Sequence, residues 1–184
     1  MRIGGAHSLD LSDYYPQKQQ LELVHRPDED TTLKLGSNGE RIVALSEQTC
    51  AVLDDWIRVN RPDVEDEYGR NPLFTTVHGR AAKSTLREHV YKITQPCHRT
   101  GECPHGRSLA SCEDKGLTAS AGCPSSVSPH AIRTDRITSL LDRGAPKEVV
   151  SGRTGVSEDV LSDYYDVRDP ASKAELRRDH LDKI

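Results

Sequence analysis

Two short β-rich runs near the N-terminus, followed by segments of helical period, most strongly limit what this chain can fold into. The runs are QLELVHR at 20–26 and ERIVALS at 40–46. The polar stretch between them contains Gly36 and Asn38-Gly39, and an Asn-Gly pair between two such runs is a hairpin signal. The two runs therefore predict a small antiparallel sheet.

The rest of the chain has apolar residues at the α-helical period, with capping residues where the segments begin. We expect the first helix to run from Ser46 to about Asn60, with a core-facing stripe of Val52, Leu53, Trp56 and Ile57. Later helices are expected from Ser84, from Ser128 to near Gly144, from Ala145-Pro146 to about Gly152, from Ser157, and from Asp169-Pro170 to about 182. The predicted fold class is mainly α with a small antiparallel β-sheet (α+β).

The composition indicates a protein without a membrane-spanning segment. The 184 residues are 34% hydrophobic, no apolar run approaches the length of a membrane span, and no signal pattern begins the chain. We therefore expect a cytoplasmic protein with no membrane partner. The net charge of -4 does not by itself indicate a nucleic-acid partner, but residues 79–92 carry four basic side chains and one acidic one, which predicts a basic face.

Four of the five cysteines lie in a Gly- and Ser-rich insertion at about 97–126. They are Cys97, Cys103, Cys112 and Cys123. Clustered cysteines in a reducing compartment indicate metal ligands, and the segment has too few apolar residues to fold by packing alone, so we expect a structural zinc site. His98 and His105 are substitute ligands. Unrelated thiols in a loop and a disulfide are the alternatives.

The stretch SPHAIR at 128–133 predicts an anion site at the start of a helix. Ser128 is a good N-cap and Pro129 suits the first helical position. His130 and Arg133 are three residues apart and so share a face, beside free backbone N–H groups and the positive end of the helix dipole. The alternative is a cap decoration with a solvated charge.

Further along the chain come Gly152-Arg153 and the paired tyrosines Tyr164 and Tyr165. With His130 and Arg133, this order resembles the catalytic domain of the tyrosine recombinase (phage integrase) family. The family pattern is H-x-x-R, a helix, a Gly-His or Gly-Trp pair, and a nucleophilic tyrosine in the next helix. Here Arg153 stands where the family has His or Trp, and its distance to Tyr165 is longer than usual.

The resemblance extends to the N-terminal part of the chain. RIGGAHSLDLSD, beginning at Arg2, is similar to the family's first arginine box, and Lys34 lies in the stretch that is similar to the family's lysine-bearing β-hairpin. The cysteine insertion is similar to one found in haloarchaeal members. An excess of 17 arginines over 8 lysines, with surplus carboxylates, is also typical of a halophilic archaeon.

The resemblance implies a site-specific recombinase that cleaves and rejoins double-stranded DNA through a 3′-phosphotyrosine, without a cofactor for catalysis and as a homo-oligomer on DNA. Arg2 and Arg133 would hold the nonbridging oxygens, because a planar guanidinium matches phosphate. His130 would assist proton transfer, Lys34 would protonate the 5′-oxygen, and Arg153 could donate to the phosphate. The motif ending in Tyr-Asp favours Tyr165 as the nucleophile, with Tyr164 as the alternative.

We expect residues 1–184 to be one recombinase catalytic domain, truncated at its N-terminus and interrupted by the cysteine insertion. Two other functions fit the residues. One is a noncatalytic, zinc-stabilised DNA-binding remnant of such a recombinase. The other is a phosphate-handling enzyme for small substrates, because His and Arg at a helix N-terminus bind any phosphate.

Overall fold

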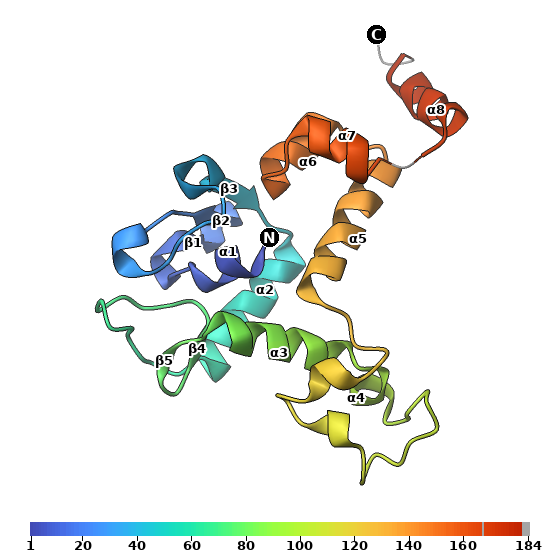
Figure 1. The fold of residues 1–184 in the computed structure, drawn as a ribbon. Coiled ribbons are helices and arrows are strands. Elements are labelled where there is room, and N and C mark those ends of the chain that lie inside the picture. Colours follow the sequence, from blue (N-terminus) through green and yellow to red (C-terminus); the bar gives the residue numbers. More distant parts are fainter. Residues whose placement is uncertain (167, 182–184) are drawn as a thin grey trace. The chain divides into compact units, whose positions relative to one another are not determined.

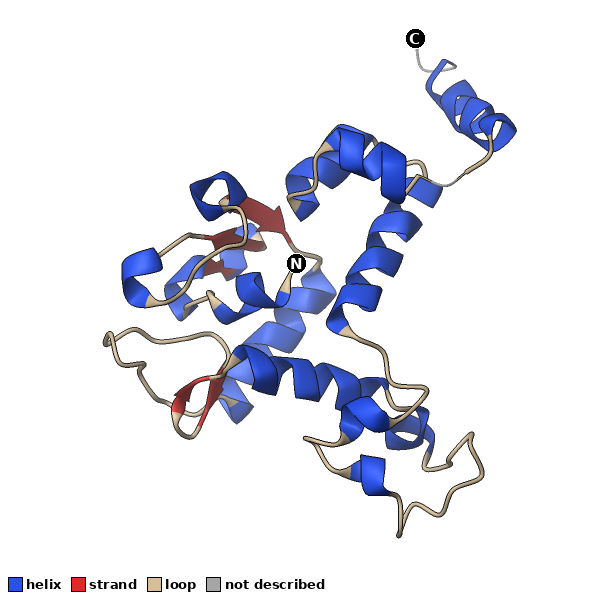
Figure 2. Cartoon of the chain, in the orientation of Figure 1, coloured by secondary structure: helices blue, strands red, loops and turns tan. Residues whose placement is uncertain are grey.

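The computed structural model describes residues 1–166 and 168–181, which form two compact units. The first unit is Met1–Ile132 and the second is Arg133–Ile184, so the division falls inside one helix. Both units are mainly helical, and the strands of the described residues lie in the first (Figures 1 and 2). The predicted fold class, mainly α with a small antiparallel sheet, is confirmed.

The predicted pairing of the two β-rich runs is confirmed. β2 (Gln20–Leu23) pairs antiparallel with β3 (Arg41–Ala44), with Leu21 opposite Val43, and β1 (Tyr14–Tyr15) adds on the other side of β2. The expected Asn-Gly turn is not a two-residue hairpin turn, because Gly36–Gly39 forms a 3₁₀ helix within a longer connection. Gly39 is buried there, and a Cβ at this position would lie 3.3 Å from Leu33 Cβ.

The first unit has a buried apolar core built from the sheet, α2 and neighbouring loops, and it contains three main helices. They are α1 (Ile3–His7), α2 (Glu47–Asp55) with a π-helical turn at Trp56–Asn60, and α3 (Lys83–Thr94); a small hairpin of β4 (Thr75–Thr76) and β5 (Gly79–Arg80) precedes α3. The buried core is Leu9, Tyr14, Leu21, Leu23, Leu33, Val43, Cys50, Leu53 and Leu73. The Ser46 cap is confirmed, since its Oγ accepts from the Thr49 N–H, but placing Val52 in the core was wrong, because its side chain is 65% exposed.

Buried ion pairs connect the N-terminal segment to the β4–β5 hairpin. The Arg80 guanidinium bonds to the carboxylates of Asp10 and Asp66, and it donates to the carbonyl oxygens of His7 at 2.8 Å and Leu9 at 3.2 Å. Arg80 is therefore not part of the basic face predicted for residues 79–92. The buried carboxylates need its charge, since an unpaired charge in the interior is costly.

The cysteine insertion folds around one buried amide rather than around an apolar core. It contains α4 (Pro96–Thr100) and 3₁₀ turns at Glu113–Lys115 and Ser120–Gly122, joined by loops (Figure 2). The Gln95 side chain, 1% exposed, donates to the carbonyl oxygens of Asp114 at 2.8 Å and Ser120 at 3.2 Å. Ser120 in turn donates from Oγ to the Glu88 carbonyl oxygen on α3.

The second unit is helical throughout its regular elements. They are α5 (Pro129–Asp142), which begins just before the division, then α6 (Lys147–Thr154), α7 (Glu158–Tyr164) and α8 (Pro170–Leu181). Its core consists of Ile137, Leu141, Val150, Val156 and Leu161. The predicted starts of these helices hold to within about two residues, and Asp169 Oδ1 accepts from two N–H groups of the first turn of α8. The expected end of α8 at about 182 lies outside the described residues.

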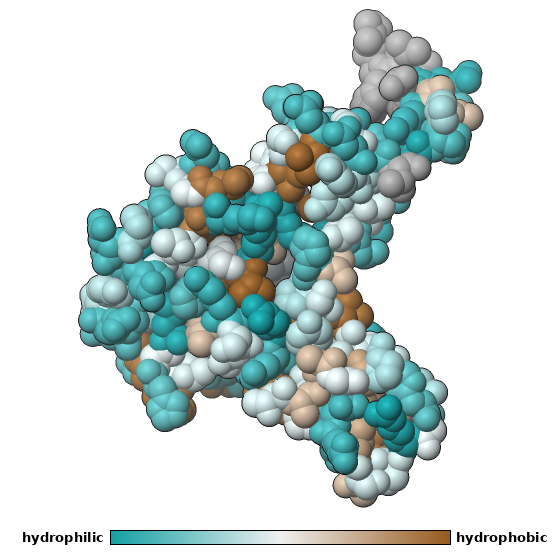
Figure 3. All heavy atoms as spheres, viewed as in Figure 1, coloured by the Kyte–Doolittle hydropathy of each residue, from teal (hydrophilic) through white to brown (hydrophobic). Residues whose placement is uncertain are grey.

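The surface drawn in Figure 3 is mostly hydrophilic, as the low hydrophobic content suggests. Within the described part of the chain, none of the helices combines the length and apolar character needed to cross a bilayer.

Candidate functional site

Two of the predicted site residues, Arg2 and Lys34, line the same cavity in the first unit. This cavity is small, and a third cation, Arg41, also lines it. The lining residues are Arg2, Gly5, Leu23, Leu33, Lys34, Leu35, Gly39 and Arg41. None of these eight is acidic, so the cavity wall presents three positive charges on an apolar floor.

Arg2 is positioned by the helix that follows it. It is the N-cap of α1, where its carbonyl oxygen accepts from the Ala6 N–H at 3.2 Å. Gly5 of α1 is buried, and a Cβ at this position would make an ordinary contact of 3.5 Å with a methyl group of Leu23 on the sheet. The other end of α1 is fixed by Arg80 through the His7 carbonyl oxygen. Arg2 is therefore half-buried beside a packed helix.

Lys34 and Arg41 are positioned by the connection between β2 and β3. Lys34 is exposed and follows the buried Leu33, whose N–H donates to Nδ1 of His25 at 3.0 Å. Arg41 begins β3 and donates from Nη1 to the Gly39 carbonyl oxygen at 2.6 Å. Burial, and then the charge of Arg2, lower the pKa of Arg41.

Sequence reasoning missed Arg41, although a signal for it was present. Side chains two residues apart in a strand point to the same side, and Val43, two residues further along β3, is buried. A charged residue in phase with the buried face of a strand is unusual, because burying a charge is costly.

The predicted helix start at SPHAIR is confirmed. Ser128 Oγ accepts from the Ala131 N–H at 3.1 Å, and Pro129 is the first residue of α5. His130 is exposed in the first turn, whereas Arg133 is only 7% exposed and donates from Nη2 to the Thr154 carbonyl oxygen at 2.9 Å. Reading Arg133 as a cap decoration with a solvated charge was therefore wrong.

This bond joins Arg133 to the end of α6, the helix that contains Arg153. Thr154, whose carbonyl oxygen binds Arg133, is the residue directly after Arg153 at the end of α6. Arg153 itself is exposed. The hydrogen bond therefore holds the buried guanidinium of Arg133 at the end of α6, and the exposed Arg153 lies on the same helix end.

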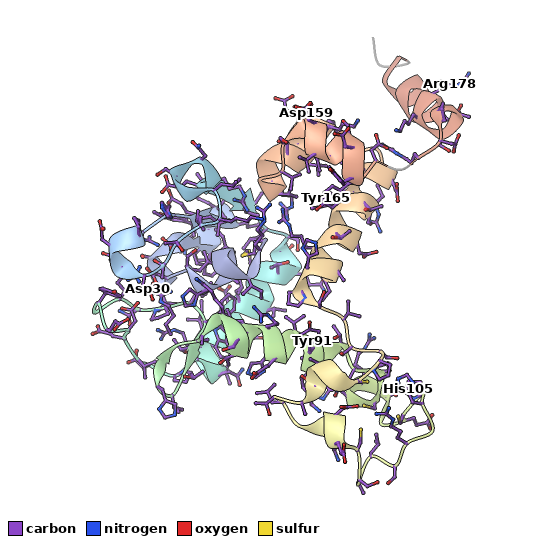
Figure 4. The ribbon with its side chains drawn as sticks, in the orientation of Figure 1. Asp30, Tyr91, His105, Asp159, Tyr165 and Arg178 are labelled. Carbon is purple, nitrogen blue, oxygen red and sulfur yellow. The ribbon has the colours of Figure 1, made fainter. Side chains whose placement is uncertain are left out.

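The two candidate tyrosines differ in how firmly they are held. Tyr164 ends α7 and is 74% exposed. Tyr165 is the C-cap of α7, where it is labelled in Figure 4, and it is half-buried against the core of the second unit. Its N–H donates to the Leu161 carbonyl oxygen at 3.2 Å.

Asp166, directly after Tyr165, is a buried carboxylate that sequence reasoning missed. It is 5% exposed and bonds to Arg168 Nε at 2.7 Å and to Lys147 Nζ at 3.1 Å. The hydrogen bond from Arg168 lowers the pKa of Asp166 to about 2. Burial acts in the opposite direction, and the hydrogen bond from Lys147 lowers the pKa further. The carboxylate is therefore charged near neutral pH and ties the end of α7 to the start of α6.

The expected zinc site is not supported by the structure. Cys97, Cys103, Cys112 and Cys123 are all free and partly exposed. Over residues 1–166 and 168–181, no group of three or more His, Cys, Asp or Glu side chains is placed to hold a metal ion. His105, labelled in Figure 4, instead bonds from Nε2 to Ser125 Oγ at 3.0 Å. Hydrogen bonds of Gln95 and Ser120 join this segment to α3.

Comparison with known proteins finds one similar sequence and several similar folds. The tyrosine recombinase XerD of Staphylococcus epidermidis is 26% identical over 164 residues, covering 85% of this chain and 47% of the relative. The XerA recombinase structure matches with a TM-score of 0.61 at 18% identity, over 97% of this chain and 53% of that one. The Tn1549 transposon integrase bound to circular-intermediate DNA matches with a TM-score of 0.65 at 16% identity, over 97% and 54%.

The chain is thus similar in sequence to a tyrosine recombinase and similar in fold to solved recombinase and integrase structures. No family model matches it. At these low identities the solved recombinase structures establish the fold alone, and the chain spans about half the length of the recombinase relatives that it matches.

Proposed function

We propose that the chain is the catalytic domain of a site-specific DNA recombinase that cleaves and rejoins DNA strands through a 3′-phosphotyrosine. The observation that carries this proposal is the cavity that joins Arg2 and Lys34, two residues far apart in the sequence that the recombinase resemblance assigns to one phosphate. The fold shared with a DNA-bound integrase supports it.

In the proposed reaction, Tyr165 Oη attacks the scissile phosphorus and loses its proton. The bond from phosphorus to the 5′-oxygen breaks, and that oxygen takes a proton from Lys34 and leaves as a 5′-hydroxyl. The 5′-hydroxyl of another strand then reverses the step and releases Tyr165. Covalent catalysis of this kind divides one difficult displacement into two easier ones and conserves the phosphodiester bond energy.

The other proposed site residues stabilise charge or move protons. Arg2 and Arg133 bind the nonbridging oxygens, and preorganised donors of this kind are each worth about 3 kcal/mol of transition-state stabilisation. His130 assists proton transfer at the phosphate or the tyrosine. Arg153 donates to the phosphate, since a guanidinium stays protonated and does not shuttle protons near neutral pH.

Tyr165 is the proposed nucleophile because its ring is held against the core, whereas Tyr164 projects into solvent. A nucleophile that is held in place loses less freedom on the way to the transition state. Asp166 supports the same choice, since its ion pairs fix the backbone next to Tyr165.

The wider setting is also proposed. Residues 1–184 serve as one catalytic domain with an insertion at 97–126, acting on double-stranded DNA in the cytoplasm as a homo-oligomer. The similarity of the insertion to haloarchaeal members, and with it a halophilic source, stays a prediction.

The test is trapping of the covalent intermediate on labelled duplexes of randomised sequence, nicked so that the short 5′-hydroxyl fragment diffuses away. We expect an adduct that survives denaturation, that Tyr165→Phe abolishes, and that the matched variant Tyr164→Phe retains. DNA binding without an adduct would instead indicate the noncatalytic remnant. An adduct lost with Tyr164→Phe and retained with Tyr165→Phe would reverse the choice of nucleophile.

A further inference from the structure

Arg41 lies where a strand residue is expected to be apolar. It is in phase with the buried Val43 on β3, and it is itself half-buried. The Gly39 carbonyl oxygen accepts one of its N–H groups at 2.6 Å, which fixes the side chain against the loop that carries Lys34. The position of the guanidinium is therefore set by the sheet on one side and by the loop on the other.

Arg41 also shares its cavity with two other cations. With Arg2 and Lys34, Arg41 makes three positive charges along the cavity wall, and none of the eight lining residues carries a carboxylate. Burial, and then the charge of Arg2, lower the pKa of Arg41 and so disfavour its charged form. An anion in the cavity would relieve this repulsion, and guanidinium groups bind phosphate oxygens in a bidentate geometry.

We infer that Arg41 is a third phosphate-binding residue of this site, whose guanidinium binds a nonbridging oxygen of the DNA phosphate that Arg2 and Lys34 contact. The inference rests on the proposed function, and it adds a residue that neither the motif nor the resemblance supplied. Its role is to neutralise charge on the scissile phosphate while Lys34, on the neighbouring loop, protonates the leaving oxygen.

The first measurement is the rate of adduct formation on a nicked duplex recovered from the randomised pool. Arg41→Gln keeps an N–H donor for the Gly39 carbonyl oxygen but removes the charge, and we expect it to slow adduct formation about 100-fold. Arg41→Lys restores a charge without the planar fork, and we expect a smaller loss, about tenfold. The matched control is Arg58→Gln, an exposed arginine on the turn after α2 whose ion pair is with Asp55, and it should stay within about twofold of the wild type.

The second measurement separates phosphate binding from a merely structural role. A methylphosphonate at the scissile position replaces one charged nonbridging oxygen with a methyl group. If Arg41 binds that oxygen, the 100-fold difference between the wild type and Arg41→Gln should shrink to less than about fivefold on one of the two methylphosphonate isomers. A defect of unchanged size on both isomers would overturn the inference, as would an Arg41→Gln variant as fast as the control.

The inference can fail separately from the proposed function. If the wild type forms no adduct, the proposed catalysis is wrong, and Arg41 is then judged by equilibrium binding to a randomised duplex. Loss of one phosphate contact should lower the slope of log K against log salt concentration by about 1. An unchanged slope and affinity in Arg41→Gln, with circular dichroism showing a folded protein, would rule Arg41 out as a phosphate-binding residue.

Discussion

Single charged residues at buried positions determine how the candidate site is held. Arg133 is buried at the Thr154 carbonyl oxygen, Arg41 is half-buried at the Gly39 carbonyl oxygen, and Asp166 is buried beside Arg168. Each is linked to a neighbouring element by a short hydrogen bond, and charge-assisted hydrogen bonds are stronger than neutral ones. These bonds also fix the positions of the residues next to them in the sequence, among them Tyr165.

The pH dependence of stability should report the Asp166 ion pairs. The pKa of this carboxyl is lowered to about 2, below its ordinary value of 3.8, so its stabilising effect is present above about pH 4 and is lost as the pH falls towards 2. We expect Asp166→Asn to reduce the free energy of unfolding at pH 7 by roughly 1 to 2 kcal/mol, since partly exposed partners are screened by solvent.

Urea denaturation at several pH values measures this effect. The difference between the wild type and Asp166→Asn should narrow as the pH falls from 4 to 3. Asp163→Asn, an exposed carboxylate on α7, serves as the control and should change little. A difference that stays constant with pH would show that the lost stability comes from packing rather than from charge.

At the scale of elements, hydrogen bonds of polar side chains hold the cysteine insertion, whereas apolar packing holds the rest of the first unit. The insertion after α3 has few apolar residues, and its 3₁₀ turns are joined to the end of α3 by the Gln95 amide and the Ser120 hydroxyl. Lys92 adds a bond from Nζ to the Lys115 carbonyl oxygen at 2.6 Å. Buried polar groups that find their partners give a segment one defined arrangement.

Replacing Gln95 should loosen the insertion and leave the second unit intact. Gln95→Leu removes both donors and leaves the carbonyl groups of Asp114 and Ser120 without them, at a cost of roughly 1 to 3 kcal/mol for each buried group left unsatisfied. Hydrogen–deuterium exchange should become at least tenfold faster over residues 113–123, with no change over α6 and α7. Gln48→Leu, at an exposed position of α2, is the control. Unchanged exchange over 113–123 would mean that other contacts hold the insertion.

At the scale of the whole chain, buried ion pairs join segments that are distant in sequence. Arg80 and Arg70 both bond to Asp10 and Asp66, and Arg26 bonds to Asp13 at 2.6 Å. Burial raises the pKa of Asp66, but the hydrogen bonds from Arg80 and from backbone N–H groups outweigh it, so the pKa is lowered overall. This network fixes the N-terminal segment that carries Arg2.

Removing one member of this network should be far more damaging than removing an exposed ion pair. Arg80→Met leaves Asp10 and Asp66 buried with less compensation, and breaking a buried pair typically costs about 3 to 5 kcal/mol. Arg58→Met breaks the ion pair between Arg58 and Asp55, in which the two side chains are 76% and 67% exposed. This variant should lose less than about 1 kcal/mol of the free energy of unfolding. Chemical denaturation gives both values. Equal losses in the two variants would argue against the buried network as the anchor of the N-terminus.

By itself, the sequence determined the local structure of this protein. Capping by Ser46, Ser128 and Asp169, and the pairing of the two β-rich runs, depend on interactions within a few residues or on alternation along a strand, so they can be read from the chain. The resemblance to recombinases likewise predicted Arg2 and Lys34 as site residues, and the two line one cavity.

Only the tertiary structure decided which polar side chains became buried, and therefore which ones hold the site. Val52 lies in the predicted apolar stripe yet faces solvent, and Arg80 belongs to a predicted basic face yet is buried. Gln95, which the sequence did not single out, joins the insertion to α3. Whether a side chain is buried depends on which distant segments pack against it, and a local sequence pattern does not contain that information. Arg41 became a candidate because the fold places it beside Arg2.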